Sequence, residues 1–372
     1  MKSDVYFTNL RCKRGFSLLN KLEKLIIRAG IDKIDFTNKF VAIKIHFGEP
    51  GNLAYIRSNY VKVIVDYVKS KGGIPFVTDA NTLYVGRRKN AVEHIEAAFE
   101  NGFNPFQVGC PVIIADGLRG NSDVEVPINL KHVKNAKIAK EIREADVIIT
   151  MNHFKGHEQA GFGGCIKNIG MGCGSRRGKM EMHNQGKPFA NLKACVSCGQ
   201  CAKICAWNAI SYDENKKAHI DESKCVGCGR CIGTCNFDAI KCKWDESTTV
   251  LNEKIAEYTY ATLLDKESFH INFIMNVSPL CDCVGVNDAA IIPDQGILAS
   301  FDPVAIDQAS ANIVNQAVRN QNTILDDCVK HNHEHNDDLF TYIHPETNWK
   351  AQLDHAERIG LGVKDYRLVK LE

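Results

Sequence analysis

The sequence contains no long hydrophobic run, no excess of one charge and no apolar segment near its start. No apolar run approaches the roughly 18 residues that a membrane-spanning helix needs, so we expect no membrane association. The formal net charge is only +2, which argues against a nucleic acid partner. The first residues, MKSDVYFTNLRCKRG, include an early acidic residue and lack the apolar core of a secretory signal. We therefore expect a cytoplasmic protein.

Cysteine is the exception in an otherwise ordinary composition. Apolar residues make up 44% of the 372 residues and charged residues 24%, which is close to a typical globular chain of about two domains. The chain nevertheless contains 16 cysteines, and a cytoplasmic protein uses so many to bind metal more often than to form disulfides. Eight of the 16 lie between positions 195 and 235, so we expect a metal centre there.

These eight cysteines form two runs of identical spacing, C-x2-C-x2-C-x3-C. Three cysteines this close together can bind three irons of one cubane cluster, while the fourth points away toward a second cluster. The spacing therefore predicts two [4Fe–4S] clusters with crossed ligation. Cluster 1 would be bound by Cys195, Cys198, Cys201 and Cys235, and cluster 2 by Cys225, Cys228, Cys231 and Cys205.

The segment 188–243 resembles bacterial two-cluster ferredoxins, which have this cysteine spacing. An internal repeat supports the resemblance, because WNAI at 207–210 recurs as FDAI at 237–240. That family usually has proline after the fourth cysteine of each run, whereas Ala206 and Asn236 stand here. Four thiolates also suit zinc, but zinc ribbons usually use two well-separated CxxC pairs. The spacing therefore favours iron–sulfur clusters.

Apolar β-like runs alternate with amphipathic stretches on both sides of this segment, which is typical of an α/β layered fold. We predict one discontinuous α/β domain, residues 1–187 and 244–372, with a predominantly parallel sheet and an inserted α+β, ferredoxin-like domain at 188–243. Predicted strands span 41–45, 75–78, 112–115, 147–150, 271–276, 297–300 and 367–371. Predicted helices span 16–29, 56–71, 88–100, 251–264 and 348–360, and another begins at Asp302-Pro303.

Polar residues gather just after four of the predicted strands. The four groups begin at His46, at Asp79, at His153 (with Lys155 and His157) and at Cys281 (with Asp282 and Cys283). Ordinary strand-to-helix turns also favour such residues. Ligands, however, bind at the carboxyl ends of strands in open α/β sheets, so four such groups favour a binding site.

The segment 161–178, GFGGCIKNIGMGCGSRRG, contains seven glycines in 18 residues. Such density would let backbone N–H groups approach a ligand closely. Lys155, Lys167, Arg176, Arg177 and Lys179 surround it with positive charge, so we expect a site for phosphate or carboxylate. The segment matches no nucleotide-binding motif, and a flexible linker into the insert is the alternative.

The segment 151–174, MNHFKGHEQAGFGGCIKNIGMGCG, together with PDQGI at 293–297 and DPVAID at 302–307, resembles the domain-of-unknown-function 362 family. Members of that family are often described as iron–sulfur center proteins, and many carry a two-cluster ferredoxin insert. The resemblance implies a redox role without naming a substrate. It also marks a shared glycine-rich motif that here includes His153, Lys155, His157, Lys167 and Asn168.

We expect two groups of site residues in the α/β domain. His153, His157 and Lys155 would take part in catalysis, with a histidine supplying protons. A small anionic substrate would be bound by Lys167, Asn168, Arg176, His46 and Asp79.

Further cysteines and histidines are weaker candidates. Cys281 and Cys283 could bind an additional metal ion, together with Cys165 or Cys173, or they could be unreactive thiols. His331, His333 and His335 could also bind a metal, but we expect a solvated loop. The lone cysteines Cys12, Cys110, Cys242 and Cys328 are expected to be buried and inert.

Two classes of function remain open. The protein could be an iron–sulfur oxidoreductase that relays electrons from its clusters to a substrate site in the α/β domain. It could instead be a non-catalytic electron-transfer or metal-maturation partner of another protein. An enclosed pocket would favour the enzyme, whereas a flat apolar surface near the clusters would favour the partner.

Overall fold

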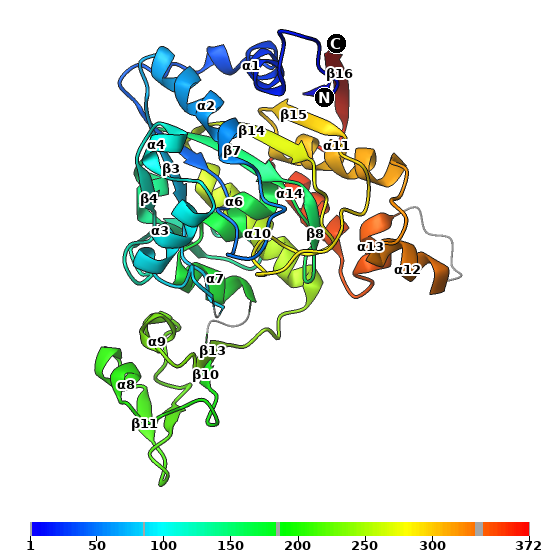
Figure 1. Cartoon of the computed structure of the whole chain (residues 1–372). Helices are drawn as coiled ribbons and strands as arrows, with labels where there is room; N and C mark the ends of the chain where they lie inside the picture. The colour runs from blue at the N-terminus through cyan, green and yellow to red at the C-terminus, as the bar shows by residue number, and fades with distance from the viewer. Residues whose placement is uncertain (1, 85, 184–186, 332–337, 372) are drawn as a thin grey trace.

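The computed structural model describes residues 2–84, 86–183, 187–331 and 338–371. Within these ranges, eight strands form one mixed, mostly parallel sheet (Figure 1). Strands β14, β7, β2, β3 and β4 run parallel, β16 runs parallel to β1, and β15 runs antiparallel to both of its neighbours. From edge to edge the strands are β16 (Tyr366–Leu371), β1 (Ser3–Asn9), β15 (Gly296–Ser300), β14 (Glu267–Ile274), β7 (Val147–His153), β2 (Phe40–Lys44), β3 (Ile74–Asp79) and β4 (Val112–Ile114).

Helices cover both faces of this sheet, giving three layers. Every residue of β7 is buried, which explains why its first three residues, 147–149, are all apolar rather than alternating. One hydrophobic core contains residues of α1 (Leu18–Arg28), α2 (Ser58–Ser70), α3 (Ala91–Glu100) and α4 (Pro105–Val108). The core on the other face contains residues of α6 (Cys165–Cys173), α10 (Thr248–Leu263), α11 (Pro303–Gln316) and α14 (Trp349–Arg358).

Smaller elements connect these layers. They are the 3-10 helix η1 (Ile31–Lys33), the hairpin β5 (Asp123–Pro127) and β6 (Asn135–Ala139), helix α5 (Lys140–Glu144), the hairpin β8 (Lys155–His157) and β9 (Gly161–Gly163), and helices α7 (Arg176–His183), α12 (Ile324–His331) and α13 (Leu339–Ile343).

The glycine-rich segment is helical, which corrects the expectation of a ligand-binding loop or a linker. Two of its glycines allow close packing of α6. A Cβ atom at Gly170 would overlap the backbone of α10, and one at Gly172 would lie 2.6 Å from the Lys44 amine. The first backbone N–H groups of α6 are already satisfied, because Cys165 and Ile166 donate to the Asp307 carboxylate at 2.7 and 2.8 Å. The segment therefore offers no free backbone cradle at this end.

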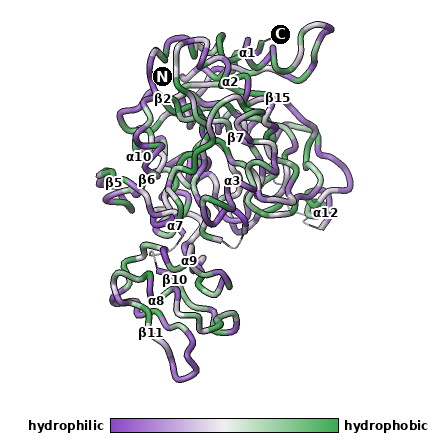
Figure 2. The backbone as a smooth tube through the Cα atoms, turned by 60° about the vertical axis from the view of Figure 1, so that its left-hand side comes forward, coloured by the Kyte–Doolittle hydropathy of each residue, from purple (hydrophilic) through white to green (hydrophobic). Residues whose placement is uncertain are grey.

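Residues 188–243 form a small lobe that projects from the main body in both views (Figures 1 and 2). Its elements repeat at an interval of 30 residues: β10 (Pro188–Ala190) and β12 (Ala218–Ile220), α8 (Gln200–Ile204) and α9 (Arg230–Thr234), and β11 (Ile210–Tyr212) and β13 (Ile240–Cys242). Strand β10 pairs with β13, and β11 pairs with β12. The sequence repeat is thus a structural repeat whose two halves interleave.

All seven predicted strands are present, displaced by no more than a few residues at their ends. The sequence reading missed β1 and both hairpins. Cys12 is exposed and Cys328 is half-buried, so the expectation that all lone cysteines are buried was wrong for these two. The His331-x-His333-x-His335 candidate lies outside the described residues.

Among the described helices, none combines the length and apolar character that crossing a bilayer requires. The cytoplasmic location expected from the sequence stays a prediction.

The Asp307 carboxylate is the interaction that fixes α6 against the sheet. It is fully buried and also accepts a hydrogen bond from the Asn272 side chain at 2.8 Å. We predict that Asp307→Asn lowers the free energy of unfolding by about 3 kcal/mol, because an amide would present donor hydrogens to partners that are themselves donors. Urea unfolding followed by circular dichroism would measure this.

Asp35→Asn is the matched control, since Asp35 is exposed and accepts from the Thr37 backbone N–H at 3.0 Å. We expect it to change stability by less than about 0.5 kcal/mol. Equal effects of the two substitutions would contradict a capping role for Asp307.

Candidate functional site

A cavity of about 250 Å³ lies beyond the carboxyl ends of β2, β3 and β7. Of the residues predicted for the site, the cavity contacts His46, Asp79, His153, Lys155, His157, Lys167, Asn168 and Cys283. Its other lining residues include Leu83, Tyr84, Arg88, Glu158, Met171, Lys179, His183 and Trp244. Strand-end residues, α6, α7 and the residues that follow the small lobe thus enclose one space.

Asp79 anchors one side of the cavity. It is buried at the end of β3 and forms ion pairs with Lys44 at 2.9 Å and Arg88 at 3.3 Å. Burial would raise the pKa of Asp79, but the charge of Lys44, with neighbouring cations, outweighs it and holds this pKa below its ordinary value. The carboxylate is therefore already neutralised by the protein and does not repel an anionic ligand.

Asp282 anchors the opposite side in a similar way. It has no exposed surface, and His153 Nδ1 lies 2.8 Å from its Oδ1 while Lys155 Nζ lies 3.4 Å from its Oδ2. The other ring nitrogen of His153 lies 2.8 Å from the Met275 carbonyl oxygen. Both ring nitrogens of His153 thus face oxygen atoms of the protein, which fixes the orientation of the ring. The catalytic role that the sequence suggested for His153 stays a prediction.

Asn168 is occupied by the protein's own polar network. Its side-chain oxygen accepts a hydrogen bond from Lys44 at 2.7 Å, and its amide nitrogen donates to Asn152 at 2.7 Å. Lys44 in turn has no exposed surface. Asn168 therefore shapes the cavity wall, and its polar atoms are engaged before any ligand arrives.

Two lysines of the cavity, Lys167 and Lys179, form no ion pair with a carboxylate among the described residues. Lys167 Nζ lies 3.6 Å from the Cys281 sulfur, and Lys179 Nζ donates to the Gly174 carbonyl at 2.5 Å. Burial lowers the pKa of Lys179 to about 8. Across the whole lining, Lys155, Lys167, Lys179 and Arg88 outnumber Asp79 and Glu158, so the cavity attracts anions.

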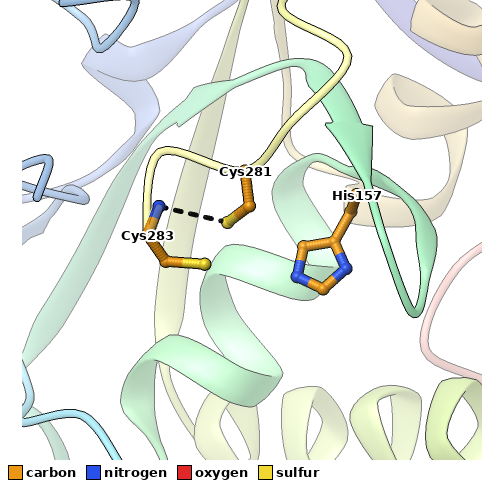
Figure 3. A group of neighbouring side chains, drawn as sticks. All are labelled: His157, Cys281 and Cys283. Atoms are coloured by element: carbon orange, nitrogen blue, oxygen red, sulfur yellow. Dashed lines mark hydrogen bonds between the residues drawn. The ribbon is translucent and has the colours of Figure 1, made fainter. Parts of the chain in front are cut away.

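Cys281, Cys283 and His157 meet at the edge of the cavity (Figure 3). Each offers one ligand atom, and the three atoms lie within 4.8 Å of one another. Cys281 and His157 are buried, and Cys283 is half-buried. Neither Cys165 nor Cys173 belongs to this group, so His157 takes the place that the sequence analysis gave to one of them.

The small lobe contains two cavities, each lined by four cysteines. One is lined by Cys195, Cys198, Cys201 and Cys235, and the other by Cys205, Cys225, Cys228 and Cys231. Each cavity therefore combines three cysteines of one run with the fourth cysteine of the other. Backbone N–H groups also approach the sulfurs, from Ala209 to Cys205 at 3.4 Å and from Ala239 to Cys235 at 3.2 Å.

A further cavity joins the small lobe to the main site. Ile240 lines both this connecting cavity and the one around Cys195, while Leu83, Tyr84 and Trp244 line both it and the main cavity. Leu83 also belongs to the hydrophobic core of the small lobe. The connecting cavity thus borders both the cavity around Cys195 and the main site.

Arg176 lies outside the main cavity, unlike the other predicted anion-binding residues. Its guanidinium is fully buried and donates to backbone carbonyl oxygens of Thr82, Lys89 and Arg119. Arg119 in turn donates to the Thr234 hydroxyl of the small lobe at 2.8 Å. Arg176 therefore holds loops at the junction between the two parts of the molecule.

Sequence reasoning missed Tyr84, Arg88, His183 and Trp244. Arg88 was placed in a helix predicted to start there, but α3 begins at Ala91, so Arg88 lies in the preceding loop. His183 and Trp244 flank the small lobe and stack edge to face with ring centroids 4.4 Å apart. These two residues meet only because the chain returns to the main body after the small lobe. The sequence alone does not show that they are close.

Comparisons with solved structures give two distant similarities. A crystal structure of a Thermotoga maritima protein has 12% sequence identity and a TM-score of 0.43, covering 81% of this chain and 58% of that one. The lactate racemase apoprotein from Thermoanaerobacterium thermosaccharolyticum has 12% identity and a TM-score of 0.37, covering 74% of this chain and 51% of that one. The chain thus spans between half and three fifths of the length of these proteins.

No curated protein matches the sequence. A family model described as "Domain of unknown function (DUF362)" matches residues 41–312, which is most of the chain. The matched range includes every residue named above as lining the main cavity. The match spans the strand ends, α6 and the cysteine-rich lobe alike. The chain therefore belongs to the DUF362 family.

Proposed function

We propose that this protein is an iron–sulfur oxidoreductase that binds two [4Fe–4S] clusters in the small lobe and delivers their electrons to a small anionic substrate in the main cavity. The observation that carries the proposal is the grouping of eight cysteines into two crossed sets of four, one set around each cavity of the lobe. This grouping is the one that the cysteine spacing predicts for two such clusters.

The chemistry of the two cysteine sets fits such a group. Burial, with the neighbouring Cys228 and Cys225, raises the pKa of Cys231 well above its ordinary value. Four thiolates therefore coexist in one set only around a cationic centre. The N–H groups of Ala209 and Ala239 donate toward the sulfurs of Cys205 and Cys235, and hydrogen bonds of this kind tune iron–sulfur sites. When bound, each cluster would supply one-electron transfer.

The proposed domain boundaries follow from the same lobe. A ferredoxin-like domain at 188–243 would be inserted into an α/β domain formed by 1–187 and 244–372. The 30-residue structural repeat and the interleaved pairs β10–β13 and β11–β12 support this division. Polar contacts that link the lobe to the main body include Lys89 to Asp238 at 3.0 Å and Arg119 to Thr234 at 2.8 Å.

The wall shared by the cavities supports delivery of electrons to the main site. Leu83, Tyr84 and Trp244 separate that site from the connecting cavity, so a ligand in contact with them would sit next to the lobe. Lys167 and Lys179 would bind its negative charge, and Leu83, Met171 and Trp244 would contact an apolar part. His157, whose ring reaches the same space, is the candidate proton donor.

A concave cavity favours the enzyme over a non-catalytic electron-transfer or maturation partner. A docking protein needs a broad accessible surface, whereas the residues gathered here line a cavity of about 250 Å³. The proposed enzyme would still need a redox partner protein to reduce its clusters.

Crossed ligation can be tested by substitution in the small lobe. We predict that Cys205→Ser damages the cluster bound by the second run, and that Cys235→Ser damages the cluster bound by the first, because each of these sulfurs lines the other run's cavity. Iron analysis and paramagnetic resonance of each variant would measure this. Cys242→Ser is the control, since the buried Cys242 lines neither cysteine cavity. If each substitution disturbs only its own run's cluster, the assignment is wrong.

The potentials of the clusters should be low. Eight cysteine ligands in bacterial-type runs, without histidine, predict reduction potentials on the order of −400 mV or somewhat above. A potentiometric titration followed by paramagnetic resonance would measure both. Values well above 0 mV for the two clusters would reject bacterial-type [4Fe–4S] centres.

Anion binding should weaken as the pH rises through about 8. Burial lowers the pKa of Lys179 to about 8, so its amine is cationic below this pH and neutral above it. Burial holds the pKa of His183 well below its ordinary value, so that ring stays neutral throughout. We predict that benzoate binding loses roughly 1 kcal/mol, about fivefold in affinity, between pH 7 and 9, as measured by calorimetry.

Lys179→Met is the control for this pH dependence. It should bind benzoate weakly at both pH values, because the titrating charge is absent. A wild-type affinity that does not change with pH, or a variant that keeps the full pH dependence, would exclude Lys179 from anion binding.

A further inference from the structure

The orientation of the His157 ring decides what the group His157, Cys281 and Cys283 can do. His157 Nδ1 accepts hydrogen bonds from the backbone N–H groups of Gln159 and Ala160, both at 3.1 Å. Backbone N–H groups only donate, so Nδ1 carries no proton and Nε2 does. A protonated nitrogen cannot ligate a metal, and Nδ1 could do so only by giving up both hydrogen bonds. The ring therefore suits hydrogen-bond donation from Nε2 better than metal binding.

The two sulfurs are arranged as unequal partners. The Cys281 sulfur accepts a hydrogen bond from the Cys283 backbone N–H at 3.4 Å and lies 3.6 Å from Lys167 Nζ. The Cys283 side chain, by hydrogen bonding, lowers the pKa of Cys281 well below its ordinary value against the effect of burial, and the charges of Lys167 and Lys155 lower it further. The same hydrogen bond, with burial, raises the pKa of Cys283.

The loop that carries both cysteines is fixed. Asp282 stands between them, is fully buried and is held by His153 at 2.8 Å and Lys155 at 3.4 Å. Cys283 lines the main cavity, whereas Cys281 is buried behind it. One sulfur is thus accessible to a ligand, and the other is a stabilised thiolate directly beside it, which is the arrangement of a dithiol that opens and closes a disulfide.

We propose that Cys281 and Cys283 form a redox-active dithiol that reduces a small anionic disulfide in the main cavity. The source of its electrons rests on the proposed function, since the two clusters would return one electron each. Two one-electron carriers match the two electrons that a disulfide accepts. The class of substrate follows from the cavity, whose lysines attract negative charge and whose volume of about 250 Å³ admits only a small molecule.

The reaction balances in three steps. The Cys283 thiol passes its proton to the Cys281 thiolate and attacks one substrate sulfur, and the substrate S–S bond breaks to release the first thiolate. That thiolate takes the proton from Cys281, and the Cys281 thiolate then attacks the mixed disulfide, which closes the Cys281–Cys283 bond and releases the second thiolate. Two electrons from the lobe and one proton finally convert this disulfide back to the Cys281 thiolate and the Cys283 thiol. His157 lies beside both sulfurs (Figure 3).

The pair can be tested without clusters. The purified protein would be equilibrated with mixtures of reduced and oxidised dithiothreitol, unfolded in acid, alkylated and analysed by peptide mass spectrometry. We expect the peptide with Cys281 and Cys283 to lose both labels together in a two-electron transition. Peptides with Cys165 or Cys173, which are buried single thiols, should stay labelled. A 281–283 peptide that keeps both labels under oxidising conditions would overturn the proposal.

Lys167 variants distinguish a reactive pair from a structural one. We expect Lys167→Met to slow alkylation of the native pair at pH 7 about tenfold, as the loss of roughly one pKa unit of thiolate stabilisation would, and Lys167→Arg to restore the rate. Slow alkylation in both variants, or an unchanged rate in Lys167→Met, contradicts the arrangement around Cys281. Circular dichroism of each variant checks that it is folded.

The coupling to the clusters is a separate arm. Photoreduced deazaflavin should open the Cys281–Cys283 disulfide in the wild type but not in the Cys205→Ser/Cys235→Ser double variant, while dithiothreitol should open it in both. If no clusters are found, the proposed function fails while the thiol titration still stands. If the clusters are present and become reduced but the disulfide persists, the dithiol proposal fails.

Two further outcomes concern the substrate and the metal alternative. The anionic disulfide dithiodiglycolate should oxidise the pair faster than the cationic disulfide cystamine at equal concentration, and the reverse order would overturn the substrate class. The alternative outcome is that one equivalent of zinc or non-cluster iron protects both thiols from alkylation and is absent from the Cys283→Ser variant. This outcome would identify a metal site and overturn the dithiol.

Discussion

Buried carboxylates need cationic partners, and this need organises the whole site. Asp79 is the last residue of β3, Asp282 lies in the loop that follows β14, and both are buried. An unpaired charge in such a place would cost several kcal/mol, so each is held by cations from other parts of the chain: Lys44 and Arg88 for Asp79, His153 and Lys155 for Asp282. These pairs fix the loops around the cavity. They also use up the negative charge and leave Lys167 and Lys179 as the charges that a ligand would meet.

A third buried carboxylate, held by N–H groups rather than by cations, helps to explain how a glycine-rich stretch became a helix. Asp307 of α11 accepts from the first N–H groups of α6, while Gly170 lets α6 approach α10 closely. Both interactions come from segments more than 80 residues away in sequence. Local propensity favours a loop for so many glycines, but tertiary packing overrides it. The result is that Lys167 and Asn168 are presented from a rigid helix rather than from a mobile loop, which suits a site that must hold a ligand against the small lobe.

Features that depend on neighbouring residues could be predicted from the sequence, whereas features that depend on contacts between distant segments could not. Seven of the eight strands of the sheet and the repeat of the cysteine lobe follow local patterns of apolar residues and spacing, and they were predicted. The rule that ligands lie at the carboxyl ends of strands also brought together His46, Asp79, His153 and Lys155, which line one cavity. What was missed depends on contacts between distant segments. The roles of Tyr84 and Trp244 require the lobe's position, and the two-sided hydrogen bonding of His153 requires coordinates, because sequence shows a histidine but not what its ring nitrogens face.

The wall between the lobe and the cavity links these arguments. Leu83 packs into the hydrophobic core of the lobe and lines the cavity as well, so a change in the lobe would be felt at the ligand site through one side chain. The loop that carries Leu83 continues to Arg88, which pairs with Asp79 and with Glu49 at 3.0 Å, and its Thr82 carbonyl accepts from Arg176. The loop is therefore held from three sides by buried charge. This rigidity depends on several ion pairs whose burial requires an unfavourable desolvation free energy. Apolar packing would stabilise a purely structural scaffold more than such pairs do. Their presence around one cavity is explained if the position of the lobe relative to the cavity must be fixed, as electron delivery to a bound ligand requires.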